Sequence, residues 1–168
     1  MPPVSLAAPD DQRVTFVELF FDLVFVFCVT QVVSLLHDGV TCVAVGEAVL
    51  VFCMVWSGCT QFTCALNAAD TTHPRVEIAT LVATAVAFFL AVGIPSAFHG
   101  YPLWFAVTYV AVRGIGLLIY DSVAFTDPTQ RAAVRFFAAF SVGGLASVVV
   151  GGFLGGTLQY VFWALAIA

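Results

Sequence analysis

The chain has 168 residues, of which 62% are hydrophobic and 9% charged, and its formal net charge at pH 7 is −5. Soluble domains carry roughly 25% charged residues, and a soluble fold of this size cannot bury so much apolar surface, which excludes a water-soluble domain. The five cations are all Arg and form no basic stripe, so the composition also excludes nucleic-acid binding. We therefore expect a protein that is solvated by a lipid bilayer.

Six apolar segments follow one another along the chain, separated by turn residues. A helix needs about 20 residues to cross the ~30 Å hydrocarbon layer. Five segments meet or approach that length, whereas the sixth stops after 11 residues. The predicted helices are 16–36, 40–66, 76–98, 103–120, 132–153 and 158–168. This pattern predicts an all-α fold, a single polytopic bundle over residues 1–168 with five full transmembrane helices and a partial sixth.

Two acidic residues, Glu18 and Asp22, lie four apart near the start of the first helix and share one face. Thr15 and Glu18 fit the capping box S/T-x-x-E, which explains Glu18 by the helix start alone. Asp22 lies seven residues past Thr15, which is about 10 Å along the helix axis. A carboxylate at that depth is costly unless it is paired, protonated or hydrated, so Asp22 requires a partner.

Arg113, in the fourth predicted helix, is the partner that the sequence offers. It lies seven residues before Tyr120, again about 10 Å from the same membrane surface. Matched depth and opposite charge predict that Asp22 and Arg113 face each other. Tyr109, one turn before Arg113, shares its face, which completes a candidate cluster with Glu18. Two interpretations stay open: a structural ion pair that fixes helix register, or an ion-coupling or substrate site.

The second helix and the loop after it carry further acidic residues. Glu47, early in the helix, is expected to be solvated near the outer surface and to have no functional role. Asn67 and Asp70 follow the helix in a short polar loop, where both residue types commonly form turns. The alternative is that Asn67 and Asp70 line the cytoplasmic mouth of the polar cluster.

The fifth helix carries a face of small residues. They recur every four positions, at Ala139, Gly143, Ser147, Gly151 and Gly155. Small residues at this spacing let helix backbones approach closely in lipid. We expect this face to pack against another helix, with a glycine hinge as the alternative.

The sequence carries no signature of catalysis or metal binding. The five Cys residues form no C-x-x-C pair, and their odd count and spacing fit no zinc site. No Ser/His pair or cofactor motif accompanies them. We therefore expect no enzymatic activity, no metal and no cofactor.

The distribution of Arg sets the expected orientation. Strict alternation of five spans puts Arg13, Arg75, Arg131 and Arg135 on one side, and the opposite loops carry no Arg. Cytoplasmic loops are enriched in positive residues, so the N-terminus is predicted to face the cytoplasm.

The segment 14–27, VTFVELFFDLVFVF, closely resembles the opening of the bacterial low-temperature-requirement A proteins. Similarity continues along nearly the whole chain, at 29–31, 60–63, 65–71, 94–95, 97–98, Tyr109 and Arg113. The resemblance implies a multi-pass protein of the bacterial cytoplasmic membrane, associated by name with growth in the cold, and it carries over no catalytic or binding residue. Several charged and polar residues fall at motif positions, which favours a functional cluster: Glu18, Asp22, Asn67, Asp70 and Arg113.

Two departures from the family pattern affect the functional interpretation. Family members are usually about twice this long, and they are rich in Trp around the end of the second helix, where only Trp56 remains here. The chain is then a truncated or degenerate copy, a fragment, or half of a site that a partner completes. Besides the lipid bilayer, the expected partners are a second copy of the chain or a missing C-terminal half.

The sequence is consistent with two classes of function. The first is an ion-coupled transporter or carrier with a buried Asp/Arg cluster. The second is a non-transporting membrane factor that acts by helix–helix association through the small-residue face, and a truncated inactive copy is a further alternative. An intramembrane enzyme has the least support, and the sequence names no substrate.

Overall fold

The described part of the chain is built from five long helices and one short helix. The structure is a computed structural model that describes residues 15–37, 39–124 and 128–167. The helices are α1 (Phe16–Val32), α2 (Cys42–Ala68), α3 (Pro74–Gly93), α4 (Pro102–Ala124), α5 (Pro128–Leu154) and α6 (Gly156–Leu165), with 3₁₀ turns η1 (Val33–Leu36) and η2 (Ile94–Ser96). Five stretches are long and apolar enough to cross a membrane. The predicted all-α architecture, with five full spans and a partial sixth, is confirmed.

The helix ends differ from the predicted ones by a few residues. α2 begins at Cys42 because the Thr41 hydroxyl accepts a hydrogen bond from the Ala44 amide at 3.2 Å and caps the helix. α3 begins at Pro74, since proline suits the first helical turn. α4 continues to Ala124, four residues beyond the predicted end. This extension places Arg113 deeper in its span than the sequence predicted.

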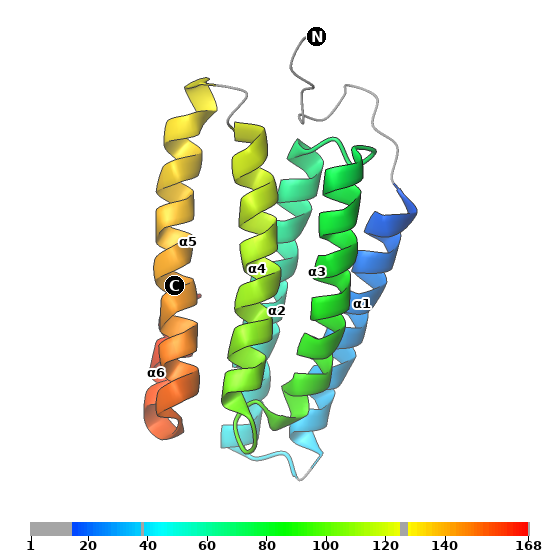
Figure 1. The fold of residues 1–168 in the computed structure, drawn as a ribbon. Helices are drawn as coiled ribbons and strands as arrows, with labels where there is room; N and C mark the ends of the chain where they lie inside the picture. The colour runs from blue at the N-terminus through cyan, green and yellow to red at the C-terminus, as the bar shows by residue number, and fades with distance from the viewer. Residues whose placement is uncertain (1–14, 38, 125–127, 168) are drawn as a thin grey trace.

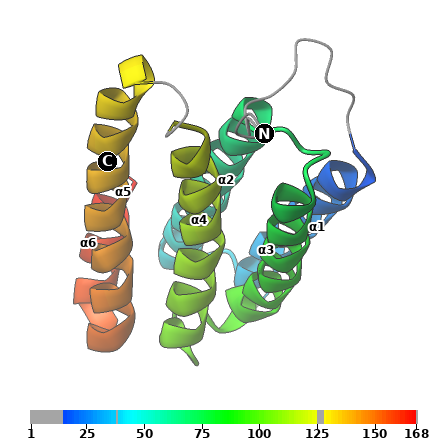
Figure 2. The same cartoon turned by 45° about the horizontal axis from the view of Figure 1, so that its top comes forward.

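Four helices lie side by side in the order α1, α3, α4, α5, with α2 behind α4 and with α6 against α5 (Figure 1). The helix α2 contacts both α4 and α1. Figure 2 shows the same row after rotation, with α4 between α3 and α5. One end of the bundle, the α2–α3 end, carries the α2–α3 connection, the start of α1 and the start of α5. The opposite end, the α3–α4 end, carries the α1–α2, α3–α4 and α5–α6 connections.

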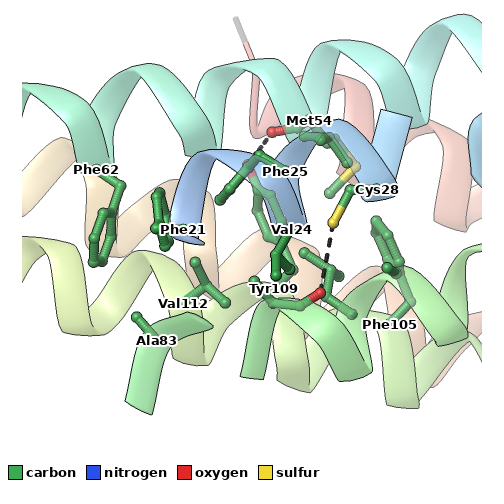
Figure 3. Close-up of a cluster of buried hydrophobic side chains, with 14 of the residues drawn as sticks. Phe21, Val24, Phe25, Cys28, Met54, Phe62, Ala83, Phe105, Tyr109 and Val112 are labelled. Atoms are coloured by element: carbon green, nitrogen blue, oxygen red, sulfur yellow. Dashed lines mark hydrogen bonds between the residues drawn. The ribbon is translucent and has the colours of Figure 1, made fainter. Parts of the chain in front are cut away.

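An aromatic core fixes how α1 is rotated in the bundle (Figure 3). Phe21 of α1 stacks on Phe62 of α2 with ring centroids 4.0 Å apart, and both rings are fully buried. Two helical turns further along the same face of α1, the Cys28 thiol donates a hydrogen bond to the Ala87 carbonyl of α3 at 3.5 Å. Because Phe21 and Cys28 point inward, the adjacent residue Asp22 lies on the exposed side of α1.

The α5–α6 connection turns the chain back on itself. Gly155 and Gly156 have φ values of 61° and 57°, a left-handed conformation that disfavours residues with a side chain. α6 then runs beside α5, and the buried Trp163 indole donates a hydrogen bond to the Val148 carbonyl at 3.0 Å. A Cβ atom at Gly151 would lie 2.8 Å from Cδ1 of Trp163, so the small residue is what permits this approach.

The close contact of α2 with α4 gives a test of the fold. A Cβ atom at Gly116 would lie 3.0 Å from Cδ2 of Phe62, whereas Gly114 has no such neighbour within 4 Å. We expect Gly116→Leu to destabilise the protein by about 1–3 kcal/mol, because overpacking forces the two helices apart. The measurement is thermal unfolding in detergent, with Gly114→Leu as the matched control. Equal melting temperatures for the two variants would contradict the packing of α4 on α2.

Candidate functional site

Arg113 lies near the middle of the span formed by α4. The span ends at Val123, ten residues later, which corresponds to about 15 Å, half of the ~30 Å hydrocarbon layer. Placing a guanidinium at the centre of a membrane helix costs at least about 2.5–3.5 kcal/mol unless polar groups surround it. The immediate surroundings of Arg113 therefore decide its role.

In the described part of the chain, the Arg113 guanidinium contacts only neutral groups. Its Nε donates a hydrogen bond to Oε1 of Gln61 at 2.5 Å, and its Nη1 donates to the hydroxyls of Ser57 at 3.1 Å and Tyr109 at 2.9 Å. The guanidinium carbon also lies 5.7 Å from the centroid of the Tyr109 ring, within cation–π range. We call these four residues, Ser57, Gln61, Tyr109 and Arg113, the Arg113 cluster.

Helical spacing predicts Tyr109 beside Arg113, whereas Ser57 and Gln61 are partners that the sequence did not predict. Both lie on α2, four residues apart and therefore on one face of an otherwise apolar helix. Polar residues at this spacing were the available signal, because such a pair offers two acceptors to a neighbouring helix. The Gln61 amide also donates to the Arg113 carbonyl at 3.3 Å, which fixes the orientation of its own side chain.

The predicted ion pair between Asp22 and Arg113 is not formed. Among the described residues, no acidic side chain lies within 4.0 Å of Arg113. Asp22 is exposed on α1, which packs mainly against α3 and α2, whereas Arg113 on α4 faces α2 and the α5 side. Arg113 also lies deeper than Asp22, because it is ten residues from the end of its span whereas Asp22 is six residues from the start of its own. In addition, the Phe21–Phe62 stack turns Asp22 away from the bundle interior.

The other predicted residues of the α2–α3 end have local roles. Glu18 forms the predicted capping box, with the Thr15 amide donating to its Oε2 at 3.2 Å and the Glu18 amide donating to the Thr15 hydroxyl at 3.4 Å. Oδ1 of Asp70 accepts hydrogen bonds from the Thr72 amide at 3.0 Å and the Thr72 hydroxyl at 2.6 Å, as in an Asx turn. Asn67 is exposed. The structure thus brings none of these three residues to the Arg113 cluster.

Two cavities meet at Ser57 and Arg113. One has a volume of about 700 Å³ and lies against the small-residue face of α5. The other, of about 510 Å³, extends toward the α2–α3 end and reaches Thr60 and Tyr120. The guanidinium therefore borders open space on two sides.

Some residues of the small-residue face of α5 line the larger cavity, and others contact α6. Ala139 and Gly143 line the larger cavity, whereas Gly151 packs against α6. Ser147 does both, since it lines the cavity and its hydroxyl donates to the Phe162 carbonyl at 3.2 Å. Gly155 lies in the α5–α6 turn. Within the described chain, the face therefore packs one helix and leaves room beside Arg113.

A second polar cluster lies at the α3–α4 end, around Glu47. The prediction that Glu47 is solvated was wrong, because the residue is only 3% exposed. Its Oε1 accepts a hydrogen bond from the Tyr160 hydroxyl at 2.5 Å and lies 3.4 Å from Nε2 of His99. The partners come from the α3–α4 connection and from α6, so the spacing around Glu47 could not reveal them. We call Glu47, His99 and Tyr160 the Glu47 cluster.

Comparison with known proteins places the chain among bacterial membrane proteins. The model of the family described as bacterial low temperature requirement A protein matches residues 13–168. An uncharacterised protein of Rhizobium meliloti (strain 1021) is 29% identical over 160 residues, which cover 94% of this chain and 39% of that protein. The chain thus spans about two fifths of that relative's length, and no solved structure matches. Because the family model covers nearly the whole chain, this multi-pass helical membrane protein belongs to the bacterial low temperature requirement A family.

Proposed function

We propose that this chain binds a small anion, a carboxylate or a phosphate, at Arg113 and carries it across the membrane. The observation that carries the proposal is a guanidinium near the middle of a span, with only neutral partners among the described residues and with two cavities beside it. A structural ion pair would leave no net charge at this position. The Arg113 cluster keeps a full positive charge, which an anion would neutralise.

Donor groups remain available in the cluster. Among the described residues, the two N–H groups of Nη2 of Arg113 have no partner at hydrogen-bond distance. Arg binds carboxylates and phosphates through charge-assisted hydrogen bonds, which are roughly twice as strong as neutral ones. The cavity volumes of about 700 and 510 Å³ fall within the range of small-molecule sites. Substrate sites near the bilayer midplane are also usual in secondary transporters.

The test of the proposed function uses inorganic phosphate and succinate as probes. We expect the chain in proteoliposomes to take up at least one of them with saturation, and Arg113→Gln to reduce the uptake to the background of empty vesicles. Gln61→Glu should also abolish uptake, because a carboxylate beside Nε competes with the anion, while thermal stability rises through the new ion pair.

Glu77→Gln is the matched control, since Glu77 is exposed in the first turn of α3 and lies outside the Arg113 cluster. Its uptake should equal that of the unmodified chain. Absence of uptake of both probes by the unmodified chain, or unchanged uptake by Arg113→Gln, would contradict the proposal.

We infer that the protein resides in the bacterial plasma membrane with the α2–α3 end in the cytoplasm. Arg75 lies at this end, and no Arg occurs in the connections at the α3–α4 end, which fits the positive-inside rule. Two spans separate successive connections at the same end, so all connections at one end lie on one side of the membrane.

Reporter fusions test this orientation. Alkaline phosphatase requires disulfides that form only outside the cytoplasm. We expect the enzyme to be inactive when fused after Thr72, at the α2–α3 end, and active when fused after Gly100, at the α3–α4 end. A cytoplasmic fluorescent reporter at the same two positions should give the opposite result. Phosphatase activity after Thr72 but not after Gly100 would reverse the assigned orientation.

A further inference from the structure

A groove with a volume of about 410 Å³ lies between α3 and α4, which stand side by side in Figures 1 and 2. One wall is formed by residues of α3 from Arg75 to Val82, and the other by residues of α4 from Ile115 to Ser122. Leu118, which lines the groove, is 71% exposed. The groove therefore opens outward from the bundle, toward the lipid that surrounds a membrane-spanning chain.

The groove runs from the membrane surface at the α2–α3 end into the hydrocarbon layer. Arg75 and Ser122 lie at its shallow end, each one residue inside the end of its span. Val82 and Ile115 lie at its deep end, each eight residues, or about 12 Å, from the same span ends. One leaflet contributes about 15 Å to the hydrocarbon layer. The groove thus lies within a single leaflet, and its lining is apolar except at the surface, which matches the distribution of polar and apolar groups in a phospholipid.

Arg75 gives the shallow end of the groove a positive charge. Among the described residues that line the groove, it is the only charged one, and within the described chain its guanidinium forms no hydrogen bond or ion pair. Glu77 lies two residues later, about 200° around α3, and therefore on the opposite side of the helix. Asp121 is about 100° around α4 from Ser122 and does not line the groove. No carboxylate of the lining therefore cancels the charge of Arg75.

We propose that this groove binds one anionic phospholipid, with its phosphate on the Arg75 guanidinium and part of an acyl chain between α3 and α4. Arg binds phosphate through charge-assisted hydrogen bonds that are often bidentate. A zwitterionic lipid carries an ammonium group near its phosphate, and Arg75 repels that cation. The site therefore favours a headgroup without a cation, such as that of phosphatidylglycerol. Basic pockets between transmembrane helices bind anionic headgroups in the same way.

The lipid site is separate from the proposed anion site. The groove shares no lining residue with the two cavities beside Arg113. A lipid in the groove contacts both α3 and α4, so its binding stabilises the packing of these helices at the α2–α3 end. Failure of either proposal leaves the other intact, because lipid binding is measured without any transported anion.

Native mass spectrometry of the purified full chain tests the proposal, with phosphatidylglycerol and phosphatidylcholine of identical acyl chains as probes. We expect the chain to bind one phosphatidylglycerol about fivefold more tightly than one phosphatidylcholine. This factor corresponds to about 1 kcal/mol, the contribution of one basic residue near an anionic membrane surface. Arg75→Gln should remove the preference. Arg75→Lys should retain part of it, because Lys keeps the charge but not the planar fork of donors.

Glu77→Gln is the matched control for the charge, since Glu77 is exposed in the same turn of α3 but lies on the side opposite Arg75. It should keep the preference of the unmodified chain. Equal affinities of the unmodified chain for the two lipids, or an unchanged preference in Arg75→Gln, would overturn the proposal.

Ala79→Phe tests the acyl-chain part of the site, because Ala79 lines the groove between its two ends. The larger side chain should lower the affinity for both lipids. Ile78→Phe is its matched control, since Ile78 is exposed and does not line the groove. If Ala79→Phe fails to fold, the exposed Arg75 still carries the test through Arg75→Gln. A folded Ala79→Phe variant with unchanged lipid affinity would contradict the assigned position of the acyl chain.

Discussion

The positive charge of Arg113 near the bilayer centre is the constraint on which the rest of the structure depends. A bare guanidinium in lipid is costly, so hydroxyl and amide groups from α2 and α4 must converge on it. These hydrogen bonds join the two helices at one point along their length. The small residues Ala139 and Gly143 of α5 leave space beside the same point. Because every partner is neutral, the cluster satisfies the geometry of the guanidinium without cancelling its charge. The described residues therefore place no negative charge within 4.0 Å of the guanidinium.

The sequence predicted those features that follow from distance along one helix. Span number follows from apolar length, the capping box from the spacing of Thr15 and Glu18, and the Tyr109–Arg113 contact from a four-residue separation. It did not predict which helices are neighbours. The depth of Asp22 follows from the rise per residue, but its direction depends on how α1 is rotated by its aromatic packing on α2. Matched depth is thus a necessary condition for an ion pair between helices and not a sufficient one.

Glu47 is a second residue whose partners the sequence did not predict. Its position near a helix start predicted solvation, because the favourable effect of the helix dipole on an acidic residue depends only on neighbouring residues of the same helix. Its partners lie 52 and 113 residues further along, and they reach Glu47 only because the α3–α4 connection folds over α2 and α6 turns back along α5. A carboxylate within a span needs a partner, and this holds for Glu47 as it does for Asp22. The spacing of residues along the chain does not reveal that the partners of Glu47 are His99 and Tyr160.

The Glu47 cluster and the Arg113 cluster both include residues of α2. Glu47 and Ser57 are ten residues apart, about 15 Å along the helix axis. At an effective dielectric constant of about 20, a negative Glu47 repels an anion at that distance by about 1 kcal/mol. The Arg113 guanidinium would be in direct contact with the anion of the proposed function, so its attraction outweighs the repulsion from the more distant Glu47 carboxylate. The distance along α2 is therefore what lets one helix carry both an acidic residue and the proposed anion site.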